Sequence, residues 1–374
     1  MKPPLDVDKL HLTESLTRLG GVETIVQQLL RGDPGSHAAA LLDAPDTGIE
    51  KGAGLRVGKL AGAFMIRRAA RARFARARTL VFHNFAGMTM LSGVIPHQRK
   101  CLFLHTNSAD VFSLLPERLP YLDAILVSGR ALENEIREKF PRITVPVTAV
   151  EYPLDDRYFE ACERVPSPTL VLGYSGRLEF EQKQVLRLVD LCQTLTALAV
   201  PFRLEIAGGG NAMAELRRRL PAEHCRFLGV LDAAGLHAAY RRWDFLICTS
   251  DYETGPLVAL EAMASGVVPV LPDIPCQATG LVADLDFPLY PPGDMAAAGR
   301  LIQRLAGDPG LAALRAQLTA KVADRRLDRF VATINGVLAE TAARPALGRT
   351  PAVPRGLAEF LPFSLRKSGN DYLR

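Results

Sequence analysis

Short hydrophobic runs of the kind that form buried strands alternate along the chain with stretches of helical periodicity. This alternation is typical of parallel sheets covered by helices on both faces. A first series of runs predicts strands at 11–15, 37–42, 79–84, 100–106, 124–128 and 147–152. A second series predicts strands at 169–176, 202–208, 225–229, 244–250 and 267–271. The pattern therefore predicts an α/β chain of two doubly wound, Rossmann-like domains.

Loop-forming composition interrupts the pattern at two places. The segment 161–169, ACERVPSPT, is typical of a linker, and 344–356 is rich in proline, glycine and arginine after a last predicted helix. We therefore predict an N-terminal domain over 1–160, a second domain over 161–343, and a linker with a tail over 344–374.

Composition narrows the functional classes. The 374 residues with 48% hydrophobic content suffice for two domain-sized cores. A net charge of +5 suits anionic ligands but does not by itself indicate nucleic acid, and we expect none as a partner. The six cysteines form no C-x-x-C pair, and neither a leader-like start nor a membrane-length apolar run is visible. We expect a reduced, cytoplasmic protein.

The stretch from Asp251 to Leu271, DYETGPLVALEAMASGVVPVL, carries the strongest chemical signal. It places Glu253 and Glu261 around the start of a predicted helix in which Pro256 suits the first turn and Gly266 suits the end. A helix start offers free N–H groups and a positive dipole end to a phosphate. Glu261, further along the helix, is suited to accept hydrogen bonds from vicinal hydroxyls such as those of ribose.

This stretch resembles the E-x7-E signature of the retaining glycosyltransferases with the GT-B fold (family 4, the group 1 glycosyl transferases). The resemblance implies two Rossmann-like domains facing a cleft, with the donor mainly on the second and the acceptor mainly on the first. It implies that Glu261 holds the ribose of a nucleotide-sugar and that Glu253 holds the hydroxyls of the sugar. The start of the helix, with Gly255, Leu257 and Val258, is then expected to contact the same donor.

Two cations follow the first strand of the second series. Arg177 comes directly after the run TLVLGYSG, and Lys183 lies six residues further on, where a strand gives way to a helix. In the resembling family a G-R-L motif followed by a lysine at this spacing clamps the diphosphate. That role is therefore expected for Arg177 and Lys183; in isolation, a pair of cations at this spacing is common by chance.

Glycines mark two further turns between a strand and a helix. Gly20 and Gly21 precede an amphipathic helix, and Gly208 and Gly209 follow the strand at 202–208. Glycine lets backbone approach a ligand closely, although a plain tight turn explains the same residues. The resemblance implies that the first pair touches donor phosphates or the acceptor and that the second pair leaves space near the nucleotide.

Histidines end two predicted strands of the first series. His105 matches the position at which the resembling enzymes place a histidine near the transferred sugar, so we expect it to hydrogen-bond a sugar hydroxyl. His83 and Asn107 are the candidates for an acceptor contact. A structural role is the alternative for each histidine, since a lone histidine at the end of a strand often has one.

Two D-x-D motifs raise the alternative of a metal-bound diphosphate. Asp6-Val7-Asp8 and Asp284-Leu285-Asp286 both match, but one precedes the first strand and the other lies in a loop. We interpret both as solvated acids and expect neither a metal nor another cofactor, because Arg177, Lys183 and the helix start would neutralise the diphosphate instead. No convincing nucleophile is visible, which favours attack on the face from which the diphosphate departs.

The segment 66–78, IRRAARARFARAR, carries six arginines on a helical pattern. Such a helix suits an anionic lipid surface, and an ordinary solvated helix face is the alternative. Acceptors of the resembling family are often lipid-linked, so a peripheral position on the inner membrane face is one expectation.

The predicted function is transfer of a sugar from a UDP- or GDP-sugar to a sugar, lipid-linked or other hydroxyl acceptor, in polysaccharide or glycolipid synthesis. Two rival functions are a nucleotide-sugar epimerase of the same fold and a non-catalytic nucleotide-sugar binding protein. A nicotinamide-dependent oxidoreductase fits less well, because Met213 stands where the last glycine of G-x-G-x-x-G belongs. Glu151 to Asp155, EYPLD, departs from the Gly-Val-Asp common in the family, so the contact there is open.

Overall fold

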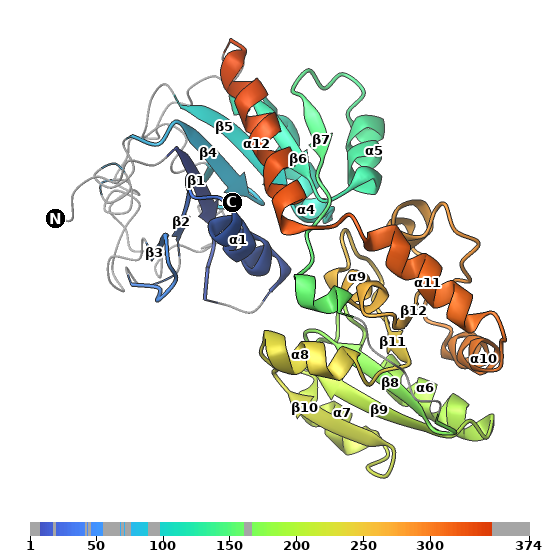
Figure 1. Cartoon of the computed structure of the whole chain (residues 1–374). Coiled ribbons are helices and arrows are strands. Elements are labelled where there is room, and N and C mark those ends of the chain that lie inside the picture. The colour runs from blue at the N-terminus through green and yellow to red at the C-terminus, as the bar shows by residue number, and fades with distance from the viewer. Residues whose placement is uncertain are drawn as a thin grey trace. The chain divides into compact units, whose positions relative to one another are not determined.

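The computed structural model describes residues 8–17, 20–41, 43, 46–54, 68, 71, 76–88, 98–160 and 167–345. Within these residues the chain forms two compact units (Figure 1). The first contains the chain up to Pro153 and again from Leu327, and the second runs from Leu154 to Arg326. Each unit is built on its own parallel sheet.

The first unit is built on a seven-stranded sheet in the order β3-β2-β1-β4-β5-β6-β7. Its strands are β1 (Lys9–Thr13), β2 (Ser36–Ala40), β3 (Gly52–Gly54), β4 (Thr79–His83), β5 (Arg99–Leu104), β6 (Ala124–Val127) and β7 (Val147–Ala149). All pairs are parallel, and the central strand β4 is buried along its whole length. Strands covered on both faces need hydrophobic residues on both faces, which explains the continuous apolar runs in the sequence.

Amphipathic helices cover this sheet. They are α1 (Gly21–Gly32), α4 (Ala109–Arg118), α5 (Arg130–Lys139) and α12 (Leu327–Ala343), with a short 3₁₀ turn at Leu119–Tyr121. In α1 the apolar residues recur on one face, so that Ile25, Val26 and Leu29 are buried while the opposite face meets solvent.

Helix α12 packs with the first unit, although it follows the second unit in the chain. A Cβ placed on Gly32 would lie 2.8 Å from the side chain of Val331, so the two helices meet closely. The Lys9 ammonium donates to Asn335 Oδ1 at 2.6 Å. The predicted boundaries, 1–160, 161–343 and 344–374, therefore differ from the units observed. The apolar face of α12 predicts a helix but does not specify which sheet it covers.

The second unit is built on a five-stranded sheet in the order β10-β9-β8-β11-β12. Its strands are β8 (Leu170–Ser175), β9 (Phe202–Ala207), β10 (Cys225–Gly229), β11 (Phe245–Ile247) and β12 (Val268–Val270). Its helices are η2 (Asp156–Phe159), α6 (Arg187–Ala197), α7 (Met213–Arg219), α8 (Ala233–Tyr240), α9 (Leu257–Ala264), η3 (Gln277–Leu281), α10 (Met295–Ala306) and α11 (Leu311–Val322). After β8 the chain adds β9 and then β10 on one side of β8. It then crosses back and adds β11 and β12 on the other side of β8.

Trp243 belongs to the core of the second unit and is fully buried. Its ring lies edge-on to Tyr240 with centroids 4.9 Å apart, and its Nε1 donates to Glu205 at 3.0 Å. A Cβ on Gly173 in β8 would lie 1.9 Å from this indole, so the strand can pass the ring only because residue 173 is glycine.

Every strand predicted from the sequence is present, with boundaries shifted by up to three residues, and the predicted α/β class of two Rossmann-like domains is confirmed. Strand β3 was missed because its sequence, Gly-Ala-Gly, contains no hydrophobic run. Within the described part of the chain, no helix is long and apolar enough to cross a membrane.

Candidate active site

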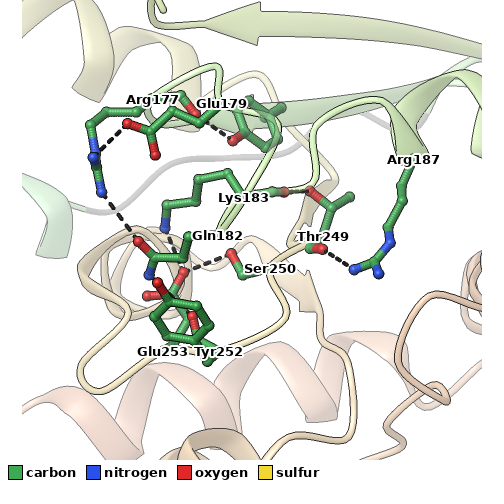
Figure 2. A network of polar contacts seen from close by, with 10 residues as sticks. Arg177, Glu179, Gln182, Lys183, Arg187, Thr249, Ser250, Tyr252 and Glu253 are labelled. Carbon is green, nitrogen blue, oxygen red and sulfur yellow. Dashed lines mark hydrogen bonds and ion pairs between the residues drawn. The ribbon is translucent and has the colours of Figure 1, made fainter. Parts of the chain in front are cut away.

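The two loops at the switch point of the second sheet bring the predicted charged residues together. β9 and β11 lie on opposite sides of β8, so the connections that leave the carboxyl ends of β8 and β11 run to opposite faces of the sheet. Parallel sheets bind ligands at this point. Arg177 and Lys183 come from the loop after β8, and Glu253 comes from the loop after β11 (Figure 2).

Lys183 and Glu253 form an ion pair between these loops. The Lys183 Nζ lies 2.5 Å from Glu253 Oε1, and the hydroxyl of Ser250 donates to the same oxygen at 2.7 Å. Their side chains are only 17% and 12% exposed, so water screens the pair far less than a surface ion pair. An ammonium group has three N–H donors, so Lys183 is able to hold Glu253 and a phosphate oxygen together.

Arg177 is held at the outer side of the same loop. Its guanidinium contacts Glu179 Oε1 at 2.5 Å and donates to Gln182 Oε1 at 3.2 Å, as Figure 2 shows. Gln182 in turn donates to the carbonyl oxygen of Tyr252 at 3.1 Å. The Arg177 side chain is 53% exposed, so it is accessible to an anion from solvent.

A second set of contacts ties the loop bases together. The Thr249 hydroxyl donates to the carbonyl of Lys183 at 2.6 Å, and Arg187 donates to the carbonyl of Thr249 at 2.8 Å. Arg187 also pairs with Asp251 at 2.6 Å. These bonds fix the backbone on both sides of the ion pair, which preorganises the charged side chains. The sequence offered no signal for Thr249, Arg187 or Ser250, because their partners lie more than sixty residues away or on irregular loops.

The glycine turn after β9 packs against the loop that carries Arg177. Gly208 has φ +137°, and a Cβ there would lie 1.9 Å from the carbonyl oxygen of Gly176. Leu178 N–H also donates to the carbonyl of Gly209 at 2.9 Å. Glycine at 208 is therefore required by close backbone packing and by a conformation that other residues rarely adopt. A contact of Gly208 and Gly209 with a nucleotide remains a prediction.

Helix α9 begins after Pro256 and ends at Ala264, two residues before the glycine that the sequence predicted to close it. The carbonyl of Pro256 accepts from the N–H groups of Ala259 and Leu260, and Gly266, with φ +67°, closes the helix with a bond to Met263. The N–H groups of Leu257 and Val258 belong to the first turn, where a helix has no internal acceptors for them. These N–H groups, with Gly255 beside them, form the helix N-terminus that the sequence predicted to bind an anion.

Glu261 lies half-buried on α9 between two tyrosines. The Tyr240 hydroxyl donates to Oε2 at 3.0 Å, and Tyr158 forms a second hydrogen bond with the same carboxyl group. Burial raises the pKa of Glu261 to about 7, although both tyrosine hydrogen bonds act in the opposite direction. The carboxyl group therefore changes charge near neutral pH. The sequence did not indicate either tyrosine as a partner.

In the first unit, the glycine pair lies at the predicted turn. Gly21 begins α1 and Gly20 precedes it with an extended backbone, φ −177°. A Cβ on Gly20 would meet the Glu23 carboxylate, which is the end of a flexible side chain. The backbone there does not demand glycine, so a ligand contact remains the reason that we expect for the pair.

His105 and His83 are hydrogen-bonded to each other, which the sequence analysis did not foresee. His105 Nε2 lies 2.7 Å from His83 Nδ1, and His105 Nδ1 lies 2.5 Å from the hydroxyl of Tyr152. The second nitrogen of His83 lies 3.0 Å from His11. Since His83 is buried and bonded at both nitrogens, this structure favours a supporting role for His83 over the predicted direct acceptor contact. Asn107 donates to Glu135 at 3.0 Å.

Of the residues considered for metal binding, Asp284 has another partner and Asp6 lies outside the described chain. Asp284 forms an ion pair with Lys321 on α11. Asp6 is outside the described residues, and so is most of the arginine-rich segment 66–78. Within the ranges that the structure describes, no cluster of three or more histidine, cysteine, aspartate or glutamate side chains is arranged to hold a metal ion.

Comparison with known proteins identifies relatives of about half of the chain. Residues 160–324 match the family model described as glycosyl transferases group 1. A glycogen synthase from Mycobacterium tuberculosis is 28% identical over 200 residues, which are 52% of this chain and 48% of that protein. A GDP-mannose-dependent alpha-mannosyltransferase from Mycolicibacterium smegmatis is 32% identical over 172 residues, 42% of this chain and 43% of its own. The chain thus spans about half the length of the curated relatives that it matches.

Solved structures resemble the fold of most of the chain. A sucrose-phosphate synthase from Thermosynechococcus elongatus has a TM-score of 0.71 at 15% identity, covering 90% of this chain and 99% of its own. Anabaena HepE, solved in complex with UDP and glucose, has a TM-score of 0.69 at 16% identity, again covering 90% and 99%. These likenesses show a common GT-B fold.

Proposed function

Because residues 160–324 match the model of the group 1 glycosyl transferases, we propose that the protein transfers a sugar from a nucleoside diphosphate sugar to a hydroxyl acceptor. The observation that carries the proposal is the Lys183–Glu253 ion pair at the switch point of the second sheet, close to a helix that presents Glu261. The names of two similar proteins support the donor class, since one is a GDP-mannose-dependent mannosyltransferase and HepE was solved with UDP and glucose.

In the proposed complex the donor diphosphate lies at the carboxyl end of β8. Arg177 and Lys183 supply positive charge, and the first turn of α9 at Leu257 and Val258 supplies backbone donors. Glu261 accepts hydrogen bonds from the ribose hydroxyls. The glycine turn at Gly208 allows backbone to approach the nucleotide closely.

Glu253 orients the sugar in this proposal. Both of its contacts, from Lys183 and Ser250, fall on Oε1. Among the residues that the structure describes, no hydrogen bond to Oε2 accompanies them, so this oxygen is free to accept from a sugar hydroxyl. A carboxylate held by an ammonium and a hydroxyl is a poor nucleophile, which supports positioning over covalent attack.

The reaction then proceeds with retention and without a metal ion. The bond from the anomeric carbon to the phosphate oxygen breaks as the acceptor oxygen bonds to the same face of that carbon. The hydroxyl proton of the acceptor passes to the departing diphosphate. Arg177, Lys183 and the α9 start stabilise the negative charge that grows on the diphosphate, and His105 contributes a contact to a sugar hydroxyl.

A donor panel tests this function. The protein is incubated with UDP-, GDP- and ADP-sugars and simple sugar acceptors, with and without EDTA, while release of nucleoside diphosphate is measured. We expect one donor class to react equally well in EDTA and to lose at least about 100-fold in rate in Glu261→Ala and Lys183→Ala. Glu223→Ala and Arg218→Ala, which remove exposed charges from the same unit, serve as matched controls.

The alternatives give different results in the same panel. Conversion of the donor sugar without an acceptor would identify an epimerase. Donor binding without turnover would identify a binding protein, and activity abolished by EDTA would overturn the metal-free mechanism. The anomeric configuration of the product, read by NMR, tests retention.

We propose that the acceptor is a sugar or a lipid-linked alcohol. We also propose that this protein is cytoplasmic and that it docks on the inner membrane face through segment 66–78. Support for docking comes from the sequence alone, because most of this segment lies outside the described residues. Sedimentation with phosphatidylserine vesicles at low salt tests it, and absence of binding would refute it.

A further inference from the structure

Three histidines from neighbouring parallel strands form one continuous chain of hydrogen bonds inside the first unit. His11 lies in β1, His83 ends β4 and His105 follows β5, and these strands are adjacent in the sheet. His11 Nδ1 lies 3.0 Å from His83 Nε2, and His83 Nδ1 lies 2.7 Å from His105 Nε2. All three side chains are buried. Each link uses one ring nitrogen of each partner, so the state of one ring constrains the next.

The two ends of the chain differ in chemistry. At one end His105 Nδ1 meets the hydroxyl of Tyr152 at 2.5 Å. At the other end His11 Nε2 lies 3.2 Å from the Ser36 hydroxyl, which donates to Asp33 Oδ2 at 2.6 Å. Asp33 closes the chain with a carboxylate, a group that accepts hydrogen bonds and donates none when ionised.

Asp33 is held in its ionised form. Burial alone would raise the pKa of Asp33, but hydrogen bonds from Lys9, Ser36 and the Gly35 N–H outweigh burial and lower it. Lys9 Nζ lies 2.6 Å from Asp33 Oδ2, and Gly35 N–H donates to Oδ1 at 3.0 Å. An ionised Asp33 requires that Ser36 donate its single proton to it.

This requirement fixes the direction of every other bond. Ser36 has no proton left for His11, so His11 must carry its proton on Nε2 and donate it to Ser36. Burial lowers the pKa of His11 to about 4 and of His105 to about 3, and that of His83 well below its ordinary value, so the rings are neutral. A neutral ring with Nε2–H has an accepting Nδ1.

The Nε2–H tautomer of His11 then requires the same tautomer in the other two histidines. His83 must donate from Nε2 to His11 Nδ1, and His105 must donate from Nε2 to His83 Nδ1. The last accepting nitrogen is His105 Nδ1, to which the Tyr152 hydroxyl donates. The chain therefore presents a hydrogen-bond acceptor at its His105 end.

We propose that Asp33 and Ser36 are positioning residues which act through His11 and His83 to hold His105 as the Nε2–H tautomer. His105 Nδ1 then accepts a hydrogen bond from a substrate hydroxyl in the place now taken by the Tyr152 hydroxyl. The identity of the hydroxyl, one on the transferred sugar, rests on the proposed function. His105 Nδ1 then favours a group that donates a hydrogen bond. It disfavours a carbonyl oxygen at the same place, since two hydrogen-bond acceptors that face each other repel.

Nitrogen-15 NMR of the histidine side chains in the full-length protein tests the direction of the chain, because it distinguishes protonated from unprotonated ring nitrogens. We expect protonated Nε2 and unprotonated Nδ1 for all three residues. In Asp33→Asn the amide is able to donate to Ser36, which frees the serine proton for His11 and favours the reversed chain. We therefore expect signal from Nδ1–H at His105, which is far from the substituted residue along the chain of bonds.

Two matched variants distinguish a specific effect on the histidine tautomers from a general destabilisation of the first unit. Tyr152→Phe removes the other end of the chain and should leave every ring in the Nε2–H form. Lys51→Ala removes hydrogen bonds to the carbonyls of Leu30 and Asp33 at the same end of α1, outside the chain, and should also leave the tautomers unchanged. Ser36→Ala supplies a second test that keeps Asp33, and it should populate Nδ1–H at His11.

Kinetics then connect the tautomer to substrate recognition. With the reacting donor, Ser36→Ala should lose about 10-fold in kcat/KM, while a donor deoxygenated at the recognised hydroxyl should be insensitive to that substitution. Unchanged histidine tautomers in both Asp33→Asn and Ser36→Ala, or Nδ1–H forms in the unmodified protein, would overturn the proposal. The NMR result requires no turnover, so an inactive protein with the expected tautomers would overturn the transferase function and leave the positioning chain standing.

Discussion

Replacing Glu261 with glutamine is expected to remove a pH dependence of stability from the second unit. Burial raises the pKa of this carboxyl group from its ordinary 4.5 to about 7. One pKa unit corresponds to about 1.4 kcal/mol, so the shift amounts to roughly 3 kcal/mol. Glutamine keeps the shape and the hydrogen bonding of the side chain but does not titrate.

The sign of the effect follows from which state holds the proton. Below pH 4.5 the Glu261 carboxyl group is protonated in the folded and the unfolded protein, so its contribution to stability is fully present. Between pH 4.5 and about 7 the unfolded chain releases the proton while the folded protein keeps it, and the free energy of unfolding falls. More than about one unit above pH 7 no further change arises from this group.

The single tryptophan makes the assay specific to the second unit. Trp243 is buried in that unit and packs on Tyr240, the hydrogen-bond partner of Glu261. Urea unfolding followed by its fluorescence, between about pH 5 and about pH 8, gives the free energy for the wild type and for Glu261→Gln. Other titrating groups occur in both proteins, so the difference between the two curves isolates Glu261.

We expect the wild type to lose about 2 kcal/mol relative to Glu261→Gln between pH 5 and pH 7, with most of the change in the assayed range complete there. Glu223→Gln, an exposed glutamate of the same unit, should follow the wild type. Parallel curves for the wild type and Glu261→Gln would refute the raised pKa. A wild-type stability that rises with pH relative to the variant would refute its direction.

Three further substitutions test other parts of the structure. Gly173→Ala forces a Cβ against the Trp243 indole and should destabilise the second unit by about 3 kcal/mol or abolish its folding; an unchanged urea midpoint would contradict the packing. Ile334→Ala in α12 should cost about 3 kcal/mol in the first unit, seen by circular dichroism, while the Trp243 transition stays in place; a shift of that transition would assign α12 to the second unit. Lys183→Ala should weaken nucleoside diphosphate binding at least about 10-fold by calorimetry, and Arg218→Ala should have no effect.

The strands were predictable because helices cover both faces of each sheet and demand continuous apolar runs. TLVFH at 79–83 is an example, and it forms the central strand β4 of the first sheet. FRLEIA at 202–207 was also predicted as a strand, although Arg203 and Glu205 interrupt its apolar residues. Helix α12 shows the limit of the same reasoning. Its apolar stripe indicates a helix, but a stripe fits either sheet, and it is contacts such as those of Gly32 and Lys9 that show which one it covers.

The candidate site was predictable where local sequence reports local structure. Pro256 and Gly266 bracket α9, and that bracket places Glu253 before the helix and Glu261 within it. Partners supplied by distant segments were invisible. Tyr158 and Tyr240 reach Glu261 from two other elements, and neither has a local pattern that points to it.

The histidine chain illustrates a different gap. Sequence reasoning treated His83 and His105 as separate candidates and passed over His11, because the strands that carry them lie far apart in the chain. Their adjacency follows from the strand order β1-β4-β5, which the sequence does not state. Once the strands are parallel neighbours, their carboxyl ends meet and the imidazoles come within hydrogen-bond distance.

Calorimetric titration of the protein with the monophosphate and the diphosphate of one nucleoside, in EDTA, tests the central claim most directly. The account predicts that one of UDP, GDP and ADP binds tighter than its monophosphate, and that Lys183→Ala removes most of this difference while Glu261→Ala weakens both ligands. Failure of all three diphosphates to bind, or a preference for the diphosphate that survives the loss of Lys183, would contradict a diphosphate site at the carboxyl end of β8.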